Sequence, residues 1–226
     1  MSAGIRFYTN NGALMIDSSY ANIALVEKVN KPTSDRSGVV EGNNAYNYYY
    51  SGRQPILVLP LSENYYCGVY TARWNSSNNR FESIVVTSGN TPLDMLVFDK
   101  PTSVNTTGPA LRVYSDIDGS KVFDSRLKYL KVVGTASDGM AVPAGAKWGL
   151  LMRERQLFIT PVYVSPGTAR GYLFVMLHCW DIYQNKLRKR QLVVYSEYFD
   201  NLASAPAYDV DPIRGVEPLI VDLKNY

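Results

Sequence analysis

The chain repeats one sequence pattern in its two halves, and this repeat constrains the fold more than any other feature. Residues 4–26 and 110–133 share an Arg-x-Tyr triplet, a glycine turn, an Asp-Ser pair and spaced aliphatic residues. Later segments match in the same order, the last pair after an insertion around 199–215: 55–60 with 161–166, 69–74 with 175–180, 84–86 with 192–194, and 96–99 with 219–222. Matches that keep one order along the chain indicate an internal duplication.

The boundary between the two copies falls at residues 101–109, a segment rich in Pro, Gly, Ser and Thr. Such a composition is typical of a linker. The 226 residues of the chain leave room for two domains of roughly 100 residues each. We therefore expect one domain over residues 1–102 and a second over residues 108–226.

Each copy consists of short apolar or alternating segments separated by turn residues. Asn11-Gly12 and Asp118-Gly119 supply the positive φ angles that tight hairpin turns require. Two further hairpins are expected around residues 75–79 and 184–186. Prolines 55, 60, 161 and 166 bracket apolar strands, because proline cannot donate to a sheet. The pattern predicts an all-β fold: two tandem β-sandwich-like domains of about seven strands each.

The composition of the chain indicates which partners and which cellular compartment to expect. A net charge of +3 is too small to indicate nucleic-acid binding by itself. No apolar run approaches the roughly 20 residues of a membrane span, and the N-terminus lacks the pattern of a secretory signal, so we expect synthesis in a cytoplasm. Cys67 and Cys179 make no disulfide framework; two buried free thiols are favoured over a bridge between them.

Candidate catalytic and metal-binding groups have simpler structural interpretations. The sole histidine, His178, precedes Cys179, but neighbours on a strand point to opposite faces and a zinc site needs further matched ligands. The repeated Asp17-Ser18 and Asp124-Ser125 pairs fit turn caps better than calcium ligands. No nucleophile elbow, phosphate loop or dinucleotide turn is present. We expect no catalytic residue, metal or cofactor, and no enzymatic activity.

Two kinds of residue are candidates for partner contacts. The tyrosine clusters at 46–50 and 63–67 are typical of adaptable contact surfaces, although alternate tyrosines could instead fill the core with their hydroxyls at its rim. The basic run 186–190 could bind nucleic acid, but a solvated edge or a salt bridge to a partner is favoured. The predicted contact residues are Tyr48, Tyr50, Tyr65, Trp74, Tyr183, Arg188 and Arg190.

The most specific motif lies at the start of copy two, where Arg112-Val-Tyr is followed by Gly119-Ser-Lys-Val-Phe-Asp-Ser125. It resembles a motif that opens modules in tail proteins of tailed bacteriophages, of the form G-L-x-V-Y-x-x-x-G-x-x-V-F-D-S. Residues 4–18 carry a looser version, with Met15-Ile16 in place of Val-Phe. The resemblance is to small tail-tip and fibre-associated proteins of phages with long non-contractile tails, and the motif contains no catalytic residue.

The resemblance implies a virion structural protein at the distal tail, synthesised in the host cytoplasm. Its partners would be other tail proteins, such as a central tail-tip or fibre protein, with several copies per tail arranged as a trimer or a ring. The alternative is a carbohydrate-binding module that contacts the bacterial surface through a shallow groove lined by Trp74, Trp180 or the tyrosine clusters. A polysaccharide depolymerase is disfavoured, because no matched set of catalytic groups is visible.

Overall fold

The structure is a computed structural model. It describes residues 6–8, 14–17, 22–40, 42–51, 55–101, 106–115, 117–151, 157–163, 170–199 and 217–226. The chain is nearly all-β, which confirms the predicted fold class. The insertion around 199–215, apart from Phe199, and part of the linker (102–105) lie outside the described residues.

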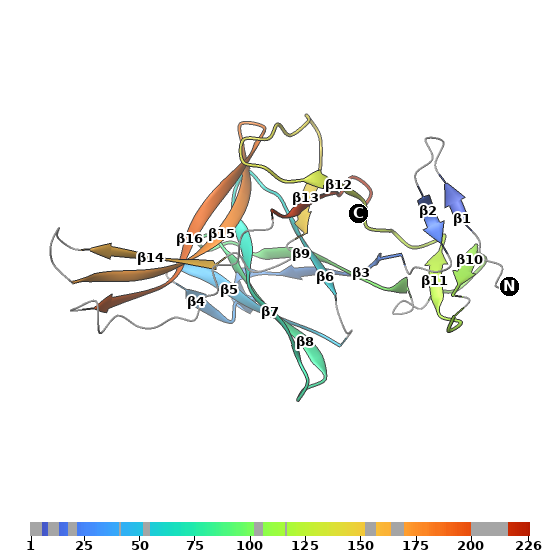
Figure 1. Ribbon diagram of the computed structural model, residues 1–226, viewed down its shortest axis with the longest axis horizontal. Helices are drawn as coiled ribbons and strands as arrows, with labels where there is room; N and C mark the ends of the chain where they lie inside the picture. Colours follow the sequence, from blue (N-terminus) through green and yellow to red (C-terminus); the bar gives the residue numbers. More distant parts are fainter. Residues whose placement is uncertain are drawn as a thin grey trace.

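The strands form two large sheets and two small hairpins (Figure 1). The first sheet has the order β12 (Val132–Thr135), β17 (Leu219–Asp222), β13 (Trp148–Leu151), β6 (Ile56–Pro60), β9 (Leu93–Asp99), β3 (Ala24–Lys31). The second has the order β14 (Leu157–Tyr163), β15 (Gly171–Tyr183), β7 (Cys67–Asn75), β8 (Arg80–Thr87), β5 (Asn43–Tyr50), β4 (Gly38–Val40), with β16 (Lys186–Phe199) also on β15. The hairpins are β1 (Arg6–Tyr8) with β2 (Leu14–Asp17), and β10 (Arg112–Tyr114) with β11 (Lys121–Asp124). A short 3-10 helix, η1 (Thr33–Asp35), precedes β4.

Both large sheets contain strands from both halves of the chain, so the expected division into separate sandwiches over 1–102 and 108–226 is corrected. In the first sheet β6 of copy one pairs with β13 of copy two. In the second sheet β7 and β15 meet at Cys67 and Trp180. The pairing satisfies backbone groups that would otherwise lie open at a sheet edge, which explains why the halves join instead of folding side by side.

The first sheet is arranged about a local two-fold axis. Its order reads β12-β17-β13 on one side and β3-β9-β6 on the other, each toward the centre. Val58 and Leu151 occupy equivalent places, opposite Leu96 and Leu219, and they also pair with each other. The sequence match of 55–60 with 161–166 is therefore wrong: residues 148–151 are the counterpart of β6.

Proline 161 shows why that match failed. It lies inside β14, not at a strand limit as expected. Among the described strands β14 pairs only with β15, and an edge strand tolerates a residue that cannot donate to the ladder. Pro60, in contrast, ends β6 as predicted.

The two copies of the motif fold alike. Arg6 pairs with Asp17 and Arg112 with Asp124, and each hairpin has an irregularity one residue further along its first strand. The following strands also share a bulge, between Leu25 and Glu27 in β3 and between Val132 and Gly134 in β12. Figure 1 shows the two hairpins next to each other at one end of the molecule.

Two apolar layers separate the parts of the sandwich. The first lies between the sheets and includes Tyr46, Leu57, Val69, Val85 and Val97. The second forms where the β15–β16 hairpin crosses the opposite face of β5, β7 and β8. Gly68 permits this crossing, because a Cβ there would lie 2.8 Å from Cys179 Sγ and 2.9 Å from Leu177 Cδ2.

Candidate partner-contact surfaces

The structure does not gather the predicted tyrosines on one surface. Tyr48 is 4% exposed and its hydroxyl donates to Glu27 Oε2 at 2.7 Å. Burial and the neighbouring carboxylate raise its pKa. Tyr48 is therefore a core residue, contrary to the prediction, because it faces the first sheet across the sandwich. Tyr50 and Tyr65 are half-buried against the same core, which matches the alternative interpretation of the clusters.

Trp74 and Tyr183 are exposed but lie far apart. Trp74 is 38% exposed near the turn of β7–β8, and Tyr183 is 51% exposed at the turn of β15–β16. Figure 1 shows these turns at the bottom and the top of the view. They do not line one groove. Trp180, which was proposed together with Trp74 for a sugar groove, is 2% exposed and belongs to the core around Leu150 and Ile220.

Three of the four cations of the basic run on β16 pair with carboxylates of the same chain. Arg188 donates to both carboxylate oxygens of the buried Asp181, at 2.9 and 2.7 Å, and Arg190 donates to the same group at 3.3 Å. Lys189 Nζ lies 3.1 Å from Glu217 Oε1. The pKa of Arg188 is raised by its hydrogen bonds to Asp181. The ion pairs of Arg188 and Arg190 are therefore intramolecular, and they reduce the positive charge that the run presents to solvent.

The histidine and the cysteines have structural surroundings. His178 is half-exposed, whereas Cys179 is buried on the other face of β15, as strand alternation requires. Desolvation lowers the pKa of His178 and raises the pKa of Cys67 to about 12. Both cysteines are free and buried. Within the described residues no group of three or more His, Cys, Asp or Glu could hold a metal ion.

Asp124 fastens the β10–β11 hairpin. It is fully buried, and Arg126 donates to both of its oxygens, at 2.9 and 2.7 Å. Arg112 donates to Oδ2 at 3.3 Å and Thr106 at 2.5 Å. The hydrogen bond from Arg126 holds the pKa of Asp124 well below its usual range, against the opposing effect of desolvation. This geometry supports the structural interpretation of the Asp-Ser pair.

Sequence reasoning missed an aromatic surface on what we call the wing, the end of the molecule formed by β14 and the paired parts of β15 and β16 (residues 171–177 and 192–199). Tyr172 and Tyr198 are opposite each other across the ladder, 45% and 46% exposed, with ring centroids 5.3 Å apart. Phe174 stacks on Tyr172 at 6.0 Å. Alternation along residues 172–174 was the available signal, but the length of the hairpin was not evident from it.

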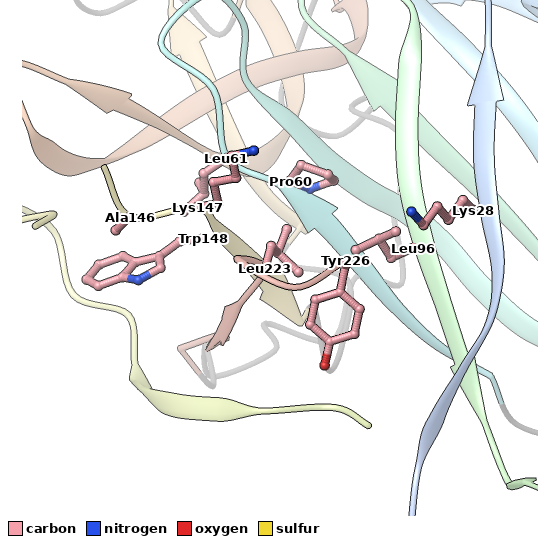
Figure 2. A pocket seen from close by; sticks show the side chains of 9 residues that line it. All are labelled: Lys28, Pro60, Leu61, Leu96, Ala146, Lys147, Trp148, Leu223 and Tyr226. Atoms are coloured by element: carbon pink, nitrogen blue, oxygen red, sulfur yellow. The ribbon is translucent and has the colours of Figure 1, made fainter. Parts of the chain in front are cut away.

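Sequence reasoning also missed a pocket of about 360 Å³, which lies on the face of the first sheet that points away from the second sheet (Figure 2). Lys28 of β3 and Lys147, just before β13, lie on opposite sides of it. The described residues that line it are Lys28, Pro60, Leu61, Leu96, Ala146, Lys147, Trp148, Leu223 and Tyr226. Lys28 and Lys147 come from different halves of the chain, so no local pattern could predict the pocket.

Gly149 lies against Leu223, one of the residues that line this pocket. A Cβ at position 149 would lie 2.7 Å from Val58 Cγ1 and 2.9 Å from Leu223 Cδ1. Because glycine has no Cβ, the Leu223 side chain can lie directly on β13. Tyr226 packs edge-on against Phe98, with ring centroids 5.4 Å apart, and its hydroxyl donates to the Tyr129 carbonyl.

No protein-family model, curated protein or solved structure matches this chain. In the part of the chain that the structure describes, there is no helix of the length and apolar character needed to cross a membrane.

Proposed function

We propose that the chain is a structural protein of a tailed-bacteriophage virion, located at the distal tail and working through contacts with other tail proteins. The observation that carries the proposal is the paired motif. The phage-tail pattern at residues 110–125 has a looser relative at 4–18, and the two share one hairpin register. A chance match would be expected in one short stretch, whereas this resemblance occurs in both halves of the chain.

The surface of the wing supports a contact role. Tyr172, Phe174 and Tyr198 form an aromatic group on the outside of β15–β16. Exposed aromatic clusters are enriched at protein–protein interfaces, where large rings bury much area at low entropic cost. A tail component that joins neighbours in a trimer or a ring would use such a surface.

Mass spectrometry of purified phage particles tests the location, and light scattering of the purified protein tests self-association. We expect the chain in the particles, and particles assembled with a Tyr172→Ser/Tyr198→Ser double variant should contain much less of it. The matched control is Tyr49→Ser, since Tyr49 is equally exposed (50%) but lies on β5 under Arg80. Absence of the wild-type chain from intact particles would contradict the proposal.

The alternative, a carbohydrate-binding module, has less support. Of the residues expected to line the groove, Trp180 is buried, and so are Tyr46 and Tyr48 of the first tyrosine cluster. A glycan array with a specific hit that Trp74→Ala abolishes would restore this alternative.

A further inference from the structure

The pocket in Figure 2 combines an apolar floor with two positive charges at its rim. Leu96 and Leu223 are 8% and 7% exposed, and Leu61 closes the side next to Lys147. The volume of about 360 Å³ falls at the lower end of the range of roughly 300–1,000 Å³ for ligand pockets. It suits a large side chain better than an extended ligand.

Within the described part of the chain, the two lysines at the rim are not neutralised, unlike Lys131 and Lys189. Lys131 pairs with Asp222 at 2.8 Å and Lys189 with Glu217 at 3.1 Å. Lys28 and Lys147 are exposed, and neither ammonium group has an ion pair or hydrogen bond to any residue that the structure describes. Two unneutralised charges on opposite sides of one apolar hollow are complementary to a ligand that is apolar in the middle and acidic on both sides.

The floor discriminates between a protein segment and a sugar. Around the hollow, the polar side-chain groups among the described lining residues are the two ammonium groups, the Trp148 indole and the Tyr226 hydroxyl. The Tyr226 hydroxyl already donates to the Tyr129 carbonyl. Sugar hydroxyls placed against Leu61, Leu96 and Leu223 would lose water without gaining partners, which costs free energy. An aliphatic or aromatic side chain has no such groups to desolvate and would not incur this cost.

We propose that this pocket docks an acidic, apolar segment of a partner protein. One Leu or Phe side chain of the partner fills the hollow over Leu96 and Leu223, and carboxylates on either side of it pair with Lys28 and Lys147. A buried apolar anchor would supply most of the affinity, and the rim charges would set the orientation and the association rate. This inference rests on the proposed function and names the chemistry of one partner.

Short fluorescein-labelled peptides, titrated by anisotropy against the full chain, test the proposal. The probe has a central Phe with two glutamates on each side. One matched peptide has glutamine for glutamate, and a second has serine for the phenylalanine. We expect the probe to bind at least about tenfold more tightly than either matched peptide, because both the anchor and the charges contribute.

Charge reversal provides the decisive variant. Lys28→Glu/Lys147→Glu should lose binding of the glutamate peptide and gain binding of a version with lysine in place of glutamate. The control Lys128→Glu/Lys186→Glu makes the same charge change at two exposed lysines that do not line the pocket, and it should leave both affinities unchanged. Circular dichroism melts confirm that both double variants are folded.

Three results would overturn the proposal: no binding of the glutamate peptide, equal binding of the glutamine peptide, or equal loss in the control variant. Oligogalacturonate, titrated in parallel, provides the sugar arm, and its binding without peptide binding would assign the pocket to an acidic glycan instead. The virion test is independent of these titrations, so a chain absent from particles would refute the tail location while leaving the peptide result to stand or fall separately.

Discussion

The two halves of the chain use the same motif and the same strand order to make unlike structures. In copy one the β7–β8 hairpin has strands of 9 and 8 residues and packs across the core on β3, β6 and β9 of the same copy. In copy two the β15–β16 hairpin has strands of 13 and 14 residues. The turn end of the β15–β16 hairpin packs on β13 and β17. The rest of the hairpin crosses the outside of copy one and forms the wing. Lengthening one hairpin thus produced both a second apolar layer and an exposed aromatic surface.

Single residues of the two halves also differ. Trp74 and Trp180 are aligned by the sequence repeat, and each lies near the turn of its hairpin. Trp74 pairs with Phe81, one pair before the end of its ladder, and Trp180 pairs with Lys189, three pairs before the end of its ladder. Yet Trp74 is 38% exposed and Trp180 is 2% exposed. Residues aligned by the repeat can therefore differ in burial, because burial depends on what packs over them: Trp180 belongs to the core around Leu150 and Ile220.

The tryptophan pair provides the largest expected difference. Trp180→Ala should lower the free energy of unfolding by roughly 3–5 kcal/mol, as for a large aromatic removed from a core. Trp74→Ala should cost less than about 1 kcal/mol, as for an exposed position. Urea denaturation of both variants measures the difference. Equal losses would show that the two aligned tryptophans are buried to a similar extent.

Asp124 tests whether copy two depends on its buried carboxylate. Asp124→Ala would leave Arg126 and Arg112 without their partner and should destabilise the β10–β11 hairpin by about 3 kcal/mol. Because the pKa of Asp124 is lowered in the folded state, its contribution is complete above the unfolded pKa of about 3.9 and is lost as the pH falls below it. Amide exchange of residues 112–114 at pH 7 and at pH 3 measures both effects, and a hairpin equally protected at both pH values would contradict them.

The close contacts at glycine should give smaller effects. Gly149→Ala and Gly68→Ala each place a Cβ under 3 Å from neighbouring side chains, and we expect each to cost about 1–3 kcal/mol through overpacking. Gly134→Ala is the matched control in β12, since its Cβ would meet nothing within 4 Å. If thermal melts show that Gly134→Ala destabilises the protein as much as the other two variants, the halves do not approach each other closely at Gly68 and Gly149.

The smallest effect concerns the thiols, one in each half. Burial raises the pKa of both Cys67 and Cys179, so at pH 8 their reaction with an aromatic disulfide reagent should be roughly 100-fold slower than in the unfolded chain. For Cys67 the associated stability is present below the unfolded pKa of about 8.5 and is lost as the pH rises toward about 12. Fast labelling of either thiol in the native protein would refute its burial.

Local sequence patterns predicted the local structure well. The turns at 75–79 and 184–186 form as expected, with positive φ at Asn79, Gln184 and Asn185. The motif hairpin of copy two turns at Gly119, whose φ is 69°. These features depend on the backbone preferences of a few adjacent residues, which a sequence displays directly.

The candidate surfaces were predicted less well, and the reason is visible in Arg188 and Tyr48. The charge of Arg188 is evident in the sequence, but its neutralisation depends on Asp181 across the hairpin. The alternation around Tyr48 indicated that one face is buried, without indicating which. Burial and charge pairing are decided by neighbours from other strands, so residue type alone could not rank the contact candidates.

The sequence by itself determined that this chain is all-β, that a motif occurs in both halves, and where its tight turns lie. The tertiary structure alone decided that the halves share two sheets, that β6 pairs with β13, and that Lys28 and Lys147 flank one pocket. The physical reason is that strands pair through backbone groups common to all residues. The choice of partner strand therefore depends on the packing of the whole chain, and surfaces built from two partners emerge only with it.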